Sequence, residues 1–138
     1  MLMRSLIVLS SLLVAGCSLF EALPPEEAVR QRADAQAQAL IAQDYEKALS
    51  FVSPAYQNGP RAKSYRARFD GASMWKRAEV AWVRCDEIPE PDRCEVRLWV
   101  YGAMPHFGGP VDQRGDTVPI SLNSVWIQVD GKWYQYLD

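Results

Sequence analysis

The side chains whose chemistry is most easily recognised are three cysteines, Cys17, Cys85 and Cys94, and a single histidine, His106. Nucleophilic catalysis needs a base held beside the nucleophile, and a thiol redox centre is usually a C-x-x-C pair. Cys85 and Cys94 are too widely spaced for such a pair, and His106 lies in a glycine-rich segment, residues 102–116, without a nucleophile motif. We therefore expect no catalytic residue among them.

Two weaker patterns could bind a metal ion. Met104 and His106 are of the kind that binds copper, but two ligands are too few to define a site. Four acidic residues crowd the segment between Cys85 and Cys94, but they lack the alternating acids and the central glycine of a calcium loop. We expect neither a metal site nor a cofactor.

The first residues have the pattern of an export signal. Arg4 supplies a positive charge, and Leu6–Val14 is an apolar run interrupted only by two serines. That run is shorter than the roughly 20 residues that a membrane-spanning helix needs. Its end, Leu13–Cys17 (LVAGC), resembles the lipobox of bacterial lipoproteins, in which cleavage precedes a cysteine that receives a diacylglyceryl group.

The lipobox resemblance implies cleavage between Gly16 and Cys17 and attachment of the lipid to Cys17; the alternative is an ordinary signal peptide with an incidental cysteine. In Gram-negative lipoproteins, an Asp directly after the lipidated cysteine resembles a signal for retention in the inner membrane. In this chain that position is occupied by Ser18. We therefore expect the outer membrane, on its periplasmic face, if the cell is Gram-negative. The expected organisation is a signal peptide over residues 1–16, a lipidated tether over residues 17–23 and one periplasmic domain over residues 24–138.

With Cys17 assigned to the lipid, Cys85 and Cys94 form an even pair in an exported chain, which predicts a disulfide. The segment between them is acidic and contains two prolines, as in a hairpin loop. If the two cysteines face each other across antiparallel strands, the register of the strands is fixed. One predicted face then carries Val83, Ala81, Val96 and Leu98, and the other carries Trp82, Val80, Ala78, Arg97, Trp99 and Tyr101.

We expect the aliphatic face to pack on the helices. The aromatic face should be partly exposed, with Arg97 stacked near Trp82.

Composition and charge exclude some classes of protein. The chain is 49% hydrophobic and 23% charged, as in ordinary globular domains, and its net charge of −2 excludes a generic basic nucleic-acid binder. Residues 61–84 are nevertheless basic, with seven Lys or Arg and two Asp or Glu. This basic segment, expected near the anchor, could face anionic lipid or an acidic partner, or it could be the solvated face of a helix.

The periodicity of the apolar residues predicts helices first and strands afterwards. The expected helices cover residues 26–42, Tyr45–Phe51 with Asp44 as N-cap, and Arg61–Phe69. The expected strands cover Trp75–Cys85, Cys94–Tyr101, Thr117–Val129 with a bulge near Asn123, and Lys132–Leu137. Asp130 and Gly131 predict a two-residue type I′ turn.

This order of elements resembles the cone-shaped fold of the nuclear-transport-factor-two-like superfamily, which includes ketosteroid isomerases. The resemblance rests on Ala39–Val52 (ALIAQDYEKALSFV) and on Val125–Tyr136 (VWIQVDGKWYQY). It implies an α+β fold with N-terminal helices packed on a curved antiparallel sheet of about four strands, and a pocket lined by the concave side. No position matches a catalytic motif of the superfamily, so no catalytic role is carried over.

These patterns favour a membrane-anchored periplasmic lipoprotein that acts as a non-catalytic binding or envelope-assembly module. The alternative is an isomerase- or hydratase-type enzyme that uses the cone cavity. The expected partners are the bilayer, through acylated Cys17, and either an envelope protein or a small apolar ligand, but no nucleic acid. The candidates for a pocket or partner surface are Trp82, Trp99, Tyr101, His106 and Trp126, which could equally be core or solvent-exposed residues.

Overall fold

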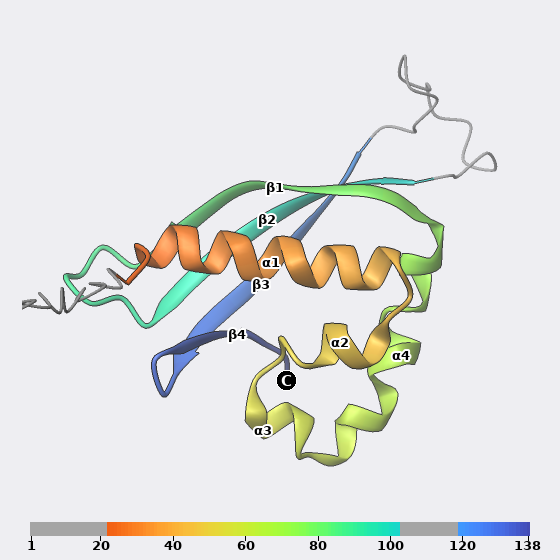
Figure 1. Cartoon of the computed structure of the whole chain (residues 1–138), viewed down its shortest axis with the longest axis horizontal. Helices are drawn as coiled ribbons and strands as arrows, with labels where there is room; N and C mark the ends of the chain where they lie inside the picture. Colours follow the sequence, from red (N-terminus) through yellow and green to blue (C-terminus); the bar gives the residue numbers. More distant parts are fainter. Residues whose placement is uncertain (1–21, 103–118) are drawn as a thin grey trace, which may run out of the picture.

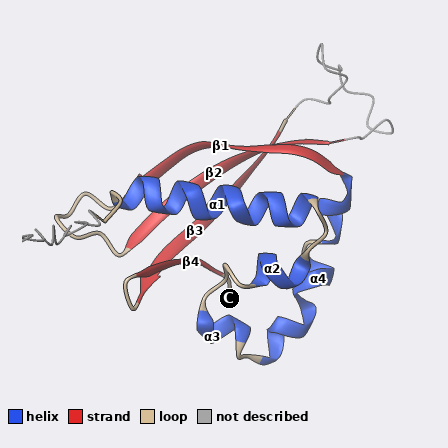
Figure 2. Cartoon of the chain, viewed as in Figure 1, coloured by secondary structure: helices blue, strands red, loops and turns tan. Residues whose placement is uncertain are grey.

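The computed structural model describes residues 22–102 and 119–138. The lipobox and His106 lie outside the described residues. Helix α1 lies along one face of a curved four-stranded sheet, and short helices cover one end (Figures 1 and 2). The elements are α1 (Pro25–Ile41), α2 (Tyr45–Leu49), α3 (Pro54–Gln57), η1 (Pro60–Ser64), α4 (Tyr65–Arg68), η2 (Asp70–Met74), β1 (Trp75–Cys85), β2 (Arg93–Gly102), β3 (Ile120–Val129) and β4 (Lys132–Tyr136).

Helix α1 begins at a proline and carries two acidic residues in its first turn, both of which suit a helix N-terminus. Its buried side is narrow and rich in alanine, so the helix axis can approach the sheet closely. The helix ends at Ile41, and Gln43, just beyond it, has a φ of 57° in the left-handed region, while the Asp44 amide donates back to the Ala39 carbonyl at 2.9 Å. In the described residues, no helix has both the length and the apolar character needed to cross a membrane.

The segment after α1 is more broken than predicted. Asp44 caps α2 as expected, since its side chain accepts a hydrogen bond from the Lys47 amide at 3.1 Å. The single helix predicted over Arg61–Phe69 is instead two shorter pieces, η1 and α4, and α3 was not predicted. Both α3 and η1 begin at a proline. A proline has no backbone N–H to donate, so it is tolerated in the first turn of a helix but interrupts a helix that is already under way.

The sheet is antiparallel with the order β1-β2-β3-β4. A disulfide joins Cys85 to Cys94, which are directly opposed, and the predicted register holds from there to Trp82 opposite Arg97. Ala81 is then an extra residue in β1, so that Val80 rather than Ala81 faces Leu98. A second shift follows between Trp75 and Arg77.

The bulge at Ala81 corrects part of the face assignment. Beyond it, Val80 and Ala78 belong to the side facing the helices, although the unshifted register placed them with the aromatic residues. The rest of the assignment is right. Val96 is buried, Val83 and Leu98 are partly buried, Trp99 is 43% exposed, and the Arg97 guanidinium lies 5.0 Å from the Trp82 ring centre.

The closing hairpin follows the predicted register, with Val129 opposite Lys132 and Val125 opposite Tyr136. Both turn residues, Asp130 and Gly131, have positive φ angles of 49° and 76°, as a type I′ turn requires. The bulge predicted near Asn123 is absent, because β3 pairs with β2 without a register shift from Ile120 onwards. Strand β4 ends before it reaches residues 120–124 of β3.

The molecule has two distinct ends. The first turn of α1, the loop between β1 and β2 and the turn between β3 and β4 lie at one end, α4 and the start of β1 lie at the other, and α3 lies between them below the sheet (Figure 1). Helix α4, within the basic segment, lies away from the first turn of α1 (Figure 1). Cys17 lies outside the described residues, so the expectation that the basic segment lies near the anchor stays a prediction. The four basic side chains of residues 61–68 are exposed, as on the solvated face of a helix.

Candidate functional site

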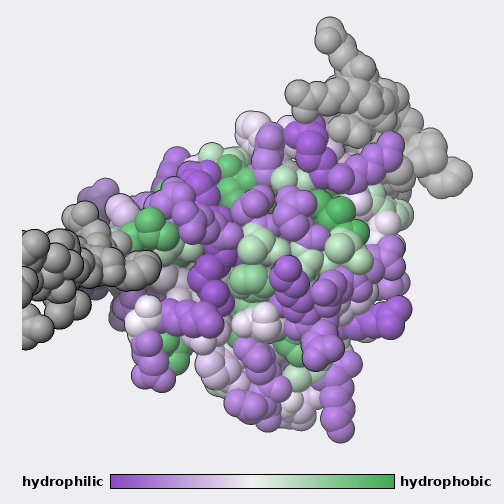
Figure 3. All heavy atoms as spheres, in the orientation of Figure 1, coloured by the Kyte–Doolittle hydropathy of each residue, from purple (hydrophilic) through white to green (hydrophobic). Residues whose placement is uncertain are grey.

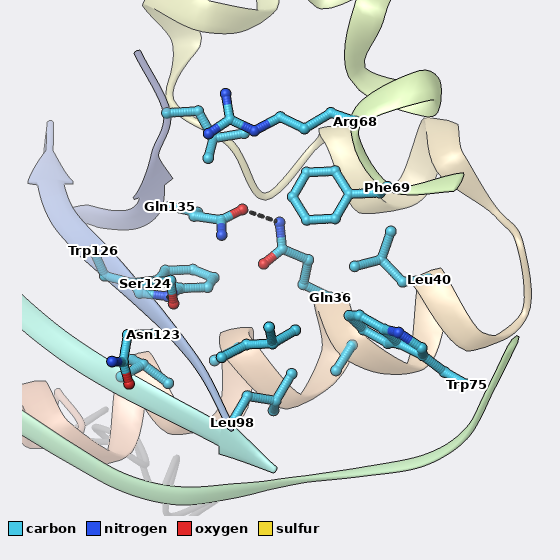
Figure 4. A pocket seen from close by; sticks show the side chains of 15 residues that line it. Gln36, Leu40, Arg68, Phe69, Trp75, Leu98, Asn123, Ser124, Trp126 and Gln135 are labelled. Carbon is cyan, nitrogen blue, oxygen red and sulfur yellow. Dashed lines mark hydrogen bonds between the residues drawn. The ribbon is translucent and has the colours of Figure 1, made fainter. Parts of the chain in front are cut away.

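A cavity of about 250 Å³ lies between α1 and the concave side of the sheet (Figure 4). Helix α1, strands β2 and β3, and the segment that connects α4 to β1 form its walls. The larger apolar lining residues are Leu40, Phe69, Trp75, Leu98, Leu122 and Trp126. The polar lining residues are Gln36, Arg68, Asn123, Ser124 and Gln135.

Two buried glutamines face each other at this cavity. Gln36 is 5% exposed and Gln135 is 8% exposed. The Nε2 atom of Gln36 donates a hydrogen bond to the Oε1 atom of Gln135 at 2.7 Å. Figure 4 shows this bond crossing from α1 to β4 at the edge of the cavity.

Each glutamine is held by the element that carries it. Gln36 follows Ala33 by three residues and precedes Leu40 by four, so it lies on the buried stripe of α1. Gln135 alternates with Trp133 on the concave side of β4, and its backbone N–H donates to the Phe51 carbonyl at 2.8 Å. The two amides are therefore fixed by the packing of α1 and β4.

The hydrogen-bonding capacity of the pair is only partly used. Within the described part of the chain, neither the Oε1 atom of Gln36 nor the Nε2 atom of Gln135 has a hydrogen-bond partner. Both atoms face the cavity in Figure 4. One acceptor and one donor are thus available side by side to a molecule that enters.

Tyr65 lies behind Gln36. It is 1% exposed, and its hydroxyl oxygen lies 3.4 Å from the Nε2 atom of Gln36, from which it accepts a weak hydrogen bond. Burial raises the pKa of Tyr65 well above its usual value, because the phenolate would lose its hydration. The hydroxyl therefore stays neutral at any physiological pH.

Ser124 and Asn123 line the sheet side of the cavity. The Oγ atom of Ser124 accepts a hydrogen bond from the indole N–H of Trp126 at 3.1 Å, which leaves the hydroxyl proton able to donate. The Oδ1 atom of Asn123 accepts from the Nε atom of Arg97 at 3.0 Å. The sheet side of the cavity thus presents neutral polar groups on an apolar background, and Arg68 adds a charged side chain to the lining.

The cavity adjoins a shallower groove of about 460 Å³ at the short end of β4. Five residues line both spaces: Arg68, Asn123, Ser124, Gln135 and Leu137. The groove adds Trp82, Arg97 and Tyr136 from the outer side of the sheet. Because β4 stops before residues 120–124 of β3, the cavity connects with the groove on the outer surface at this edge of the sheet.

The structure separates the five predicted pocket candidates. Trp126 is fully buried and lines the cavity, and Trp82 lines the groove. Trp99 is exposed on the outer side, and Tyr101 lies on the same side. His106 lies outside the described residues.

The outer side of the sheet forms pairs between cations and aromatic rings. The Trp82 ring has the guanidinium carbons of Arg84 at 4.3 Å and Arg97 at 5.0 Å from its centre. Arg77 lies 3.6 Å from the Tyr101 ring centre, and the Tyr101 hydroxyl donates to Glu79 at 2.9 Å. We predicted the pair of Arg97 and Trp82. Arg84, the next residue but one in β1, contacts the same ring where the register is unshifted, and the pair of Arg77 and Tyr101 arises from the shifted register.

The sequence reasoning did not identify Gln36 and Gln135 as site residues. The available signal was a polar residue inside an apolar pattern: Gln36 in the Ala33–Leu40 stripe, and Gln135 two residues after Trp133 in a strand. Arg68 is the ionisable residue among those that line the cavity. Among the described residues, no cluster of three or more His, Cys, Asp or Glu could hold a metal ion.

No protein-family model and no curated protein matches the sequence. Solved structures do match the fold. A SEC-C motif containing protein from Psychrobacter arcticus superposes with a TM-score of 0.58 at 15% identity, over 86% of this chain and 64% of that one. The present chain thus spans less than two thirds of that protein.

Two further structures have similar statistics. One, from Thiobacillus denitrificans, carries the name of a calcium/calmodulin-dependent protein kinase type II association domain, with a TM-score of 0.52, 13% identity, and coverage of 75% of this chain and 86% of that one. The other, named an NTF2-like transpeptidase, is from Campylobacter jejuni, with a TM-score of 0.49, 14% identity, and coverage of 78% and 96%. At these identities the likeness concerns the fold, which is the α+β arrangement of helices on an open antiparallel sheet that the sequence predicted.

Proposed function

We propose that the protein is a lipoprotein, anchored through Cys17 to the periplasmic face of the outer membrane, whose folded domain is a non-catalytic binding module. The observation that carries the binding function is the cavity of about 250 Å³ beside two glutamines that are more than nine-tenths buried. Concave sites with an apolar lining and a few fixed polar groups are typical of small-molecule binding. The lipobox pattern of Leu13–Cys17 supports the anchor.

A small ligand fits these observations better than a large protein partner on the helix side. On the face that carries α1, apolar side chains are scattered among hydrophilic ones rather than gathered in one patch (Figure 3). Broad protein interfaces usually present a contiguous apolar area. The interior cavity is therefore the favoured site on this side of the molecule.

One observation favours the alternative, an isomerase- or hydratase-type enzyme. A residue with a strongly shifted pKa beside a pocket is a candidate for catalysis, and Tyr65 has such a shift. However, Gln36 rather than Tyr65 lines the cavity, and a raised pKa makes the hydroxyl a weaker acid. A binding function predicts that Tyr65→Phe leaves ligand affinity within about twofold, as long as the domain is folded.

Ligand-observed ¹⁹F NMR with fluorobenzene tests the binding function, using the full-length protein in phosphatidylcholine vesicles and protein-free vesicles as reference. Leu98→Phe should fill the cavity and abolish the protein-dependent line broadening. Ile127→Phe is the matched control, because it adds the same ring to the outer side of β3. If fluorobenzene shows no protein-dependent broadening, or if both variants bind it equally, the cavity is not the binding site.

Intact-mass measurement of protein extracted from membranes tests the anchor. The expected N-terminus is Cys17 carrying two or three acyl chains, and Cys17→Ser should abolish both the cleavage and the lipid. A mature chain that begins at any other residue contradicts the proposal.

A further inference from the structure

We propose that the cavity selects uncharged ligands in which a hydrogen-bond acceptor and a donor lie side by side on an apolar body, as in a carboxamide or a lactam. This inference rests on the proposed binding function and names the class of ligand. It follows from the arrangement of Gln36 and Gln135.

A single hydrogen bond between two primary amides uses one donor and one acceptor. Each amide group carries a carbonyl oxygen and an NH₂ group, so one carbonyl and one NH₂ remain. Here these are the Oε1 atom of Gln36 and the Nε2 atom of Gln135, which lack partners within residues 22–102 and 119–138. A ligand that fills the cavity would take these two atoms out of solvent, and leaving them unpaired there would be unfavourable, so a ligand that pairs with both is favoured over one that pairs with neither.

The direction of the bond between the glutamines is fixed by their surroundings. The Nε2 atom of Gln36 lies 3.4 Å from the Ala48 carbonyl oxygen, which can only accept a hydrogen bond. The NH₂ group of Gln36 is therefore turned towards Ala48 and Gln135, and its carbonyl is left for the cavity. Rotating both amides together would exchange the two free groups and would still leave one donor and one acceptor.

The charge of the site argues for a neutral ligand. The buried polar groups at the cavity are two amides and, behind them, the neutral hydroxyl of Tyr65. An ion placed among them would lose its hydration without a buried counter-charge. Arg68 is exposed at the rim and already donates to the Asp138 carbonyl oxygen at 3.3 Å, so its charge acts largely through solvent.

Ser124, on β3 next to β4, extends the same pattern along the sheet side of the cavity. Because its oxygen already accepts from Trp126, its hydroxyl proton can be donated to a second lone pair of the ligand carbonyl. A carboxamide oxygen has two lone pairs, so it can accept from Gln135 and Ser124 together. Its own N–H then donates to the Oε1 atom of Gln36.

Three probes of nearly equal shape test the inference: benzamide, acetophenone and benzoate. Benzamide carries the donor and the acceptor, acetophenone replaces the NH₂ group by a methyl group, and benzoate carries only acceptors and a negative charge. Equilibrium dialysis of the full-length protein in phosphatidylcholine vesicles, with empty vesicles subtracted, measures the three affinities. We expect benzamide to bind about tenfold more tightly than acetophenone, because acetophenone leaves the Gln36 carbonyl unpaired.

The outcomes separate this inference from the proposed function. Equal binding of benzamide and acetophenone overturns the inference but leaves cavity binding intact, and tightest binding of benzoate overturns it in favour of Arg68. If none of the three binds and fluorobenzene also fails, the proposed function itself is wrong.

A variant sharpens the test. Gln135→Met removes the free donor but leaves Gln36 with the Ala48 and Tyr65 acceptors. Because the carbonyl of either probe would use that donor, the variant should weaken benzamide and acetophenone by a similar factor, about fivefold, and leave fluorobenzene binding unchanged. The matched control is Gln38→Met, an exposed glutamine on α1, which should keep both wild-type affinities. The wild-type probe series stands by itself if Gln135→Met does not fold.

Discussion

The two sides of the sheet use similar residue types in opposite ways. On the concave side, Trp126 is fully buried and bonded to Ser124, and it packs in an apolar cluster that includes Val29, Val96 and Trp133. On the outer side, Trp82 and Tyr101 are covered by guanidinium groups instead of by a helix. The concave side is stabilised by burial of apolar side chains away from water. The outer side is stabilised by pairs of cations and aromatic rings that remain in contact with water.

The two sides of the sheet therefore differ in what they contribute to the fold and to the cavity. Burial on the concave side fixes the positions of α1 and β4, and thereby of the two glutamines. The outer pairs cover aromatic surface without fixing another element. Substitutions on the concave side should therefore change the fold and the cavity together, whereas outer substitutions should change neither by much.

The largest expected effect comes from the buried tryptophan. Trp126→Ala should lower the free energy of unfolding by about 3–5 kcal/mol, because it leaves a large void beneath α1. Trp99→Ala is the matched substitution on the outer side, where 43% of the residue is exposed, and it should cost less than about 1 kcal/mol. Urea unfolding followed by circular dichroism measures both; similar losses would mean that the two sides are not energetically distinct.

The disulfide should give the next effect. It closes a short loop at the end of β1 and β2, so its reduction should cost about 2.5 kcal/mol in the chain-entropy model. The same unfolding experiment with and without a phosphine reductant measures this loss. Free-thiol labelling of the folded, exported protein should detect neither Cys85 nor Cys94, and labelling of both without reductant would contradict the pairing.

Alkaline pH should distinguish two tyrosines. Because the folded state raises the pKa of Tyr65, the unfolded chain loses this proton first, and stability should fall as pH rises above about 10. Below that pH the contribution of Tyr65 is fully present. The hydrogen bond to Glu79 raises the pKa of Tyr101 as well, but that residue lies on the outer side.

Urea midpoints between pH 8 and pH 11 test this for Tyr65→Phe and Tyr101→Phe. The first substitution should flatten the alkaline fall more than the second. The reverse order would show that Tyr65 is not the buried group described above.

The smallest expected effect concerns the stacked outer pair. Arg97→Ala removes one of the two guanidinium groups on Trp82 and the bond to Asn123, and it should cost about 0.5–1 kcal/mol. Arg84→Ala, which removes the other guanidinium, is the natural comparison. A loss above about 2 kcal/mol for either would mean that the outer side contributes to the core.

The strand pairings could be predicted where a local constraint fixed them. The cysteine pair set the register of Trp82 opposite Arg97, and Asp130 with Gly131 set the last hairpin, because both constraints act between neighbours in space. The bulge at Ala81 could not be predicted, since alanine suits either face and no turn residue marks the position.

The site was harder to predict than the fold. Trp126 was among the candidates because a large aromatic side chain is a common lining residue of pockets. Glutamine is usually exposed, so its position in the sequence does not indicate a buried site. Gln36 and Gln135 are 99 residues apart in sequence, and they become a pair only when the fold brings α1 and β4 together. That contact depends on the whole fold, so no local pattern contains it.

The bulge at Ala81 also bears on how this sequence can change length. Val80 and Trp82 already face consecutive residues of β2, Leu98 and Arg97, so the chain could lose position 81 and keep every other side chain of β1 on its present side. A deletion at a regularly paired position such as Val83 would turn the preceding residues, up to the bulge, to the opposite side. In an alignment of relatives, a one-residue gap in β1 is therefore expected at position 81, and a gap elsewhere in the strand would indicate a different pairing.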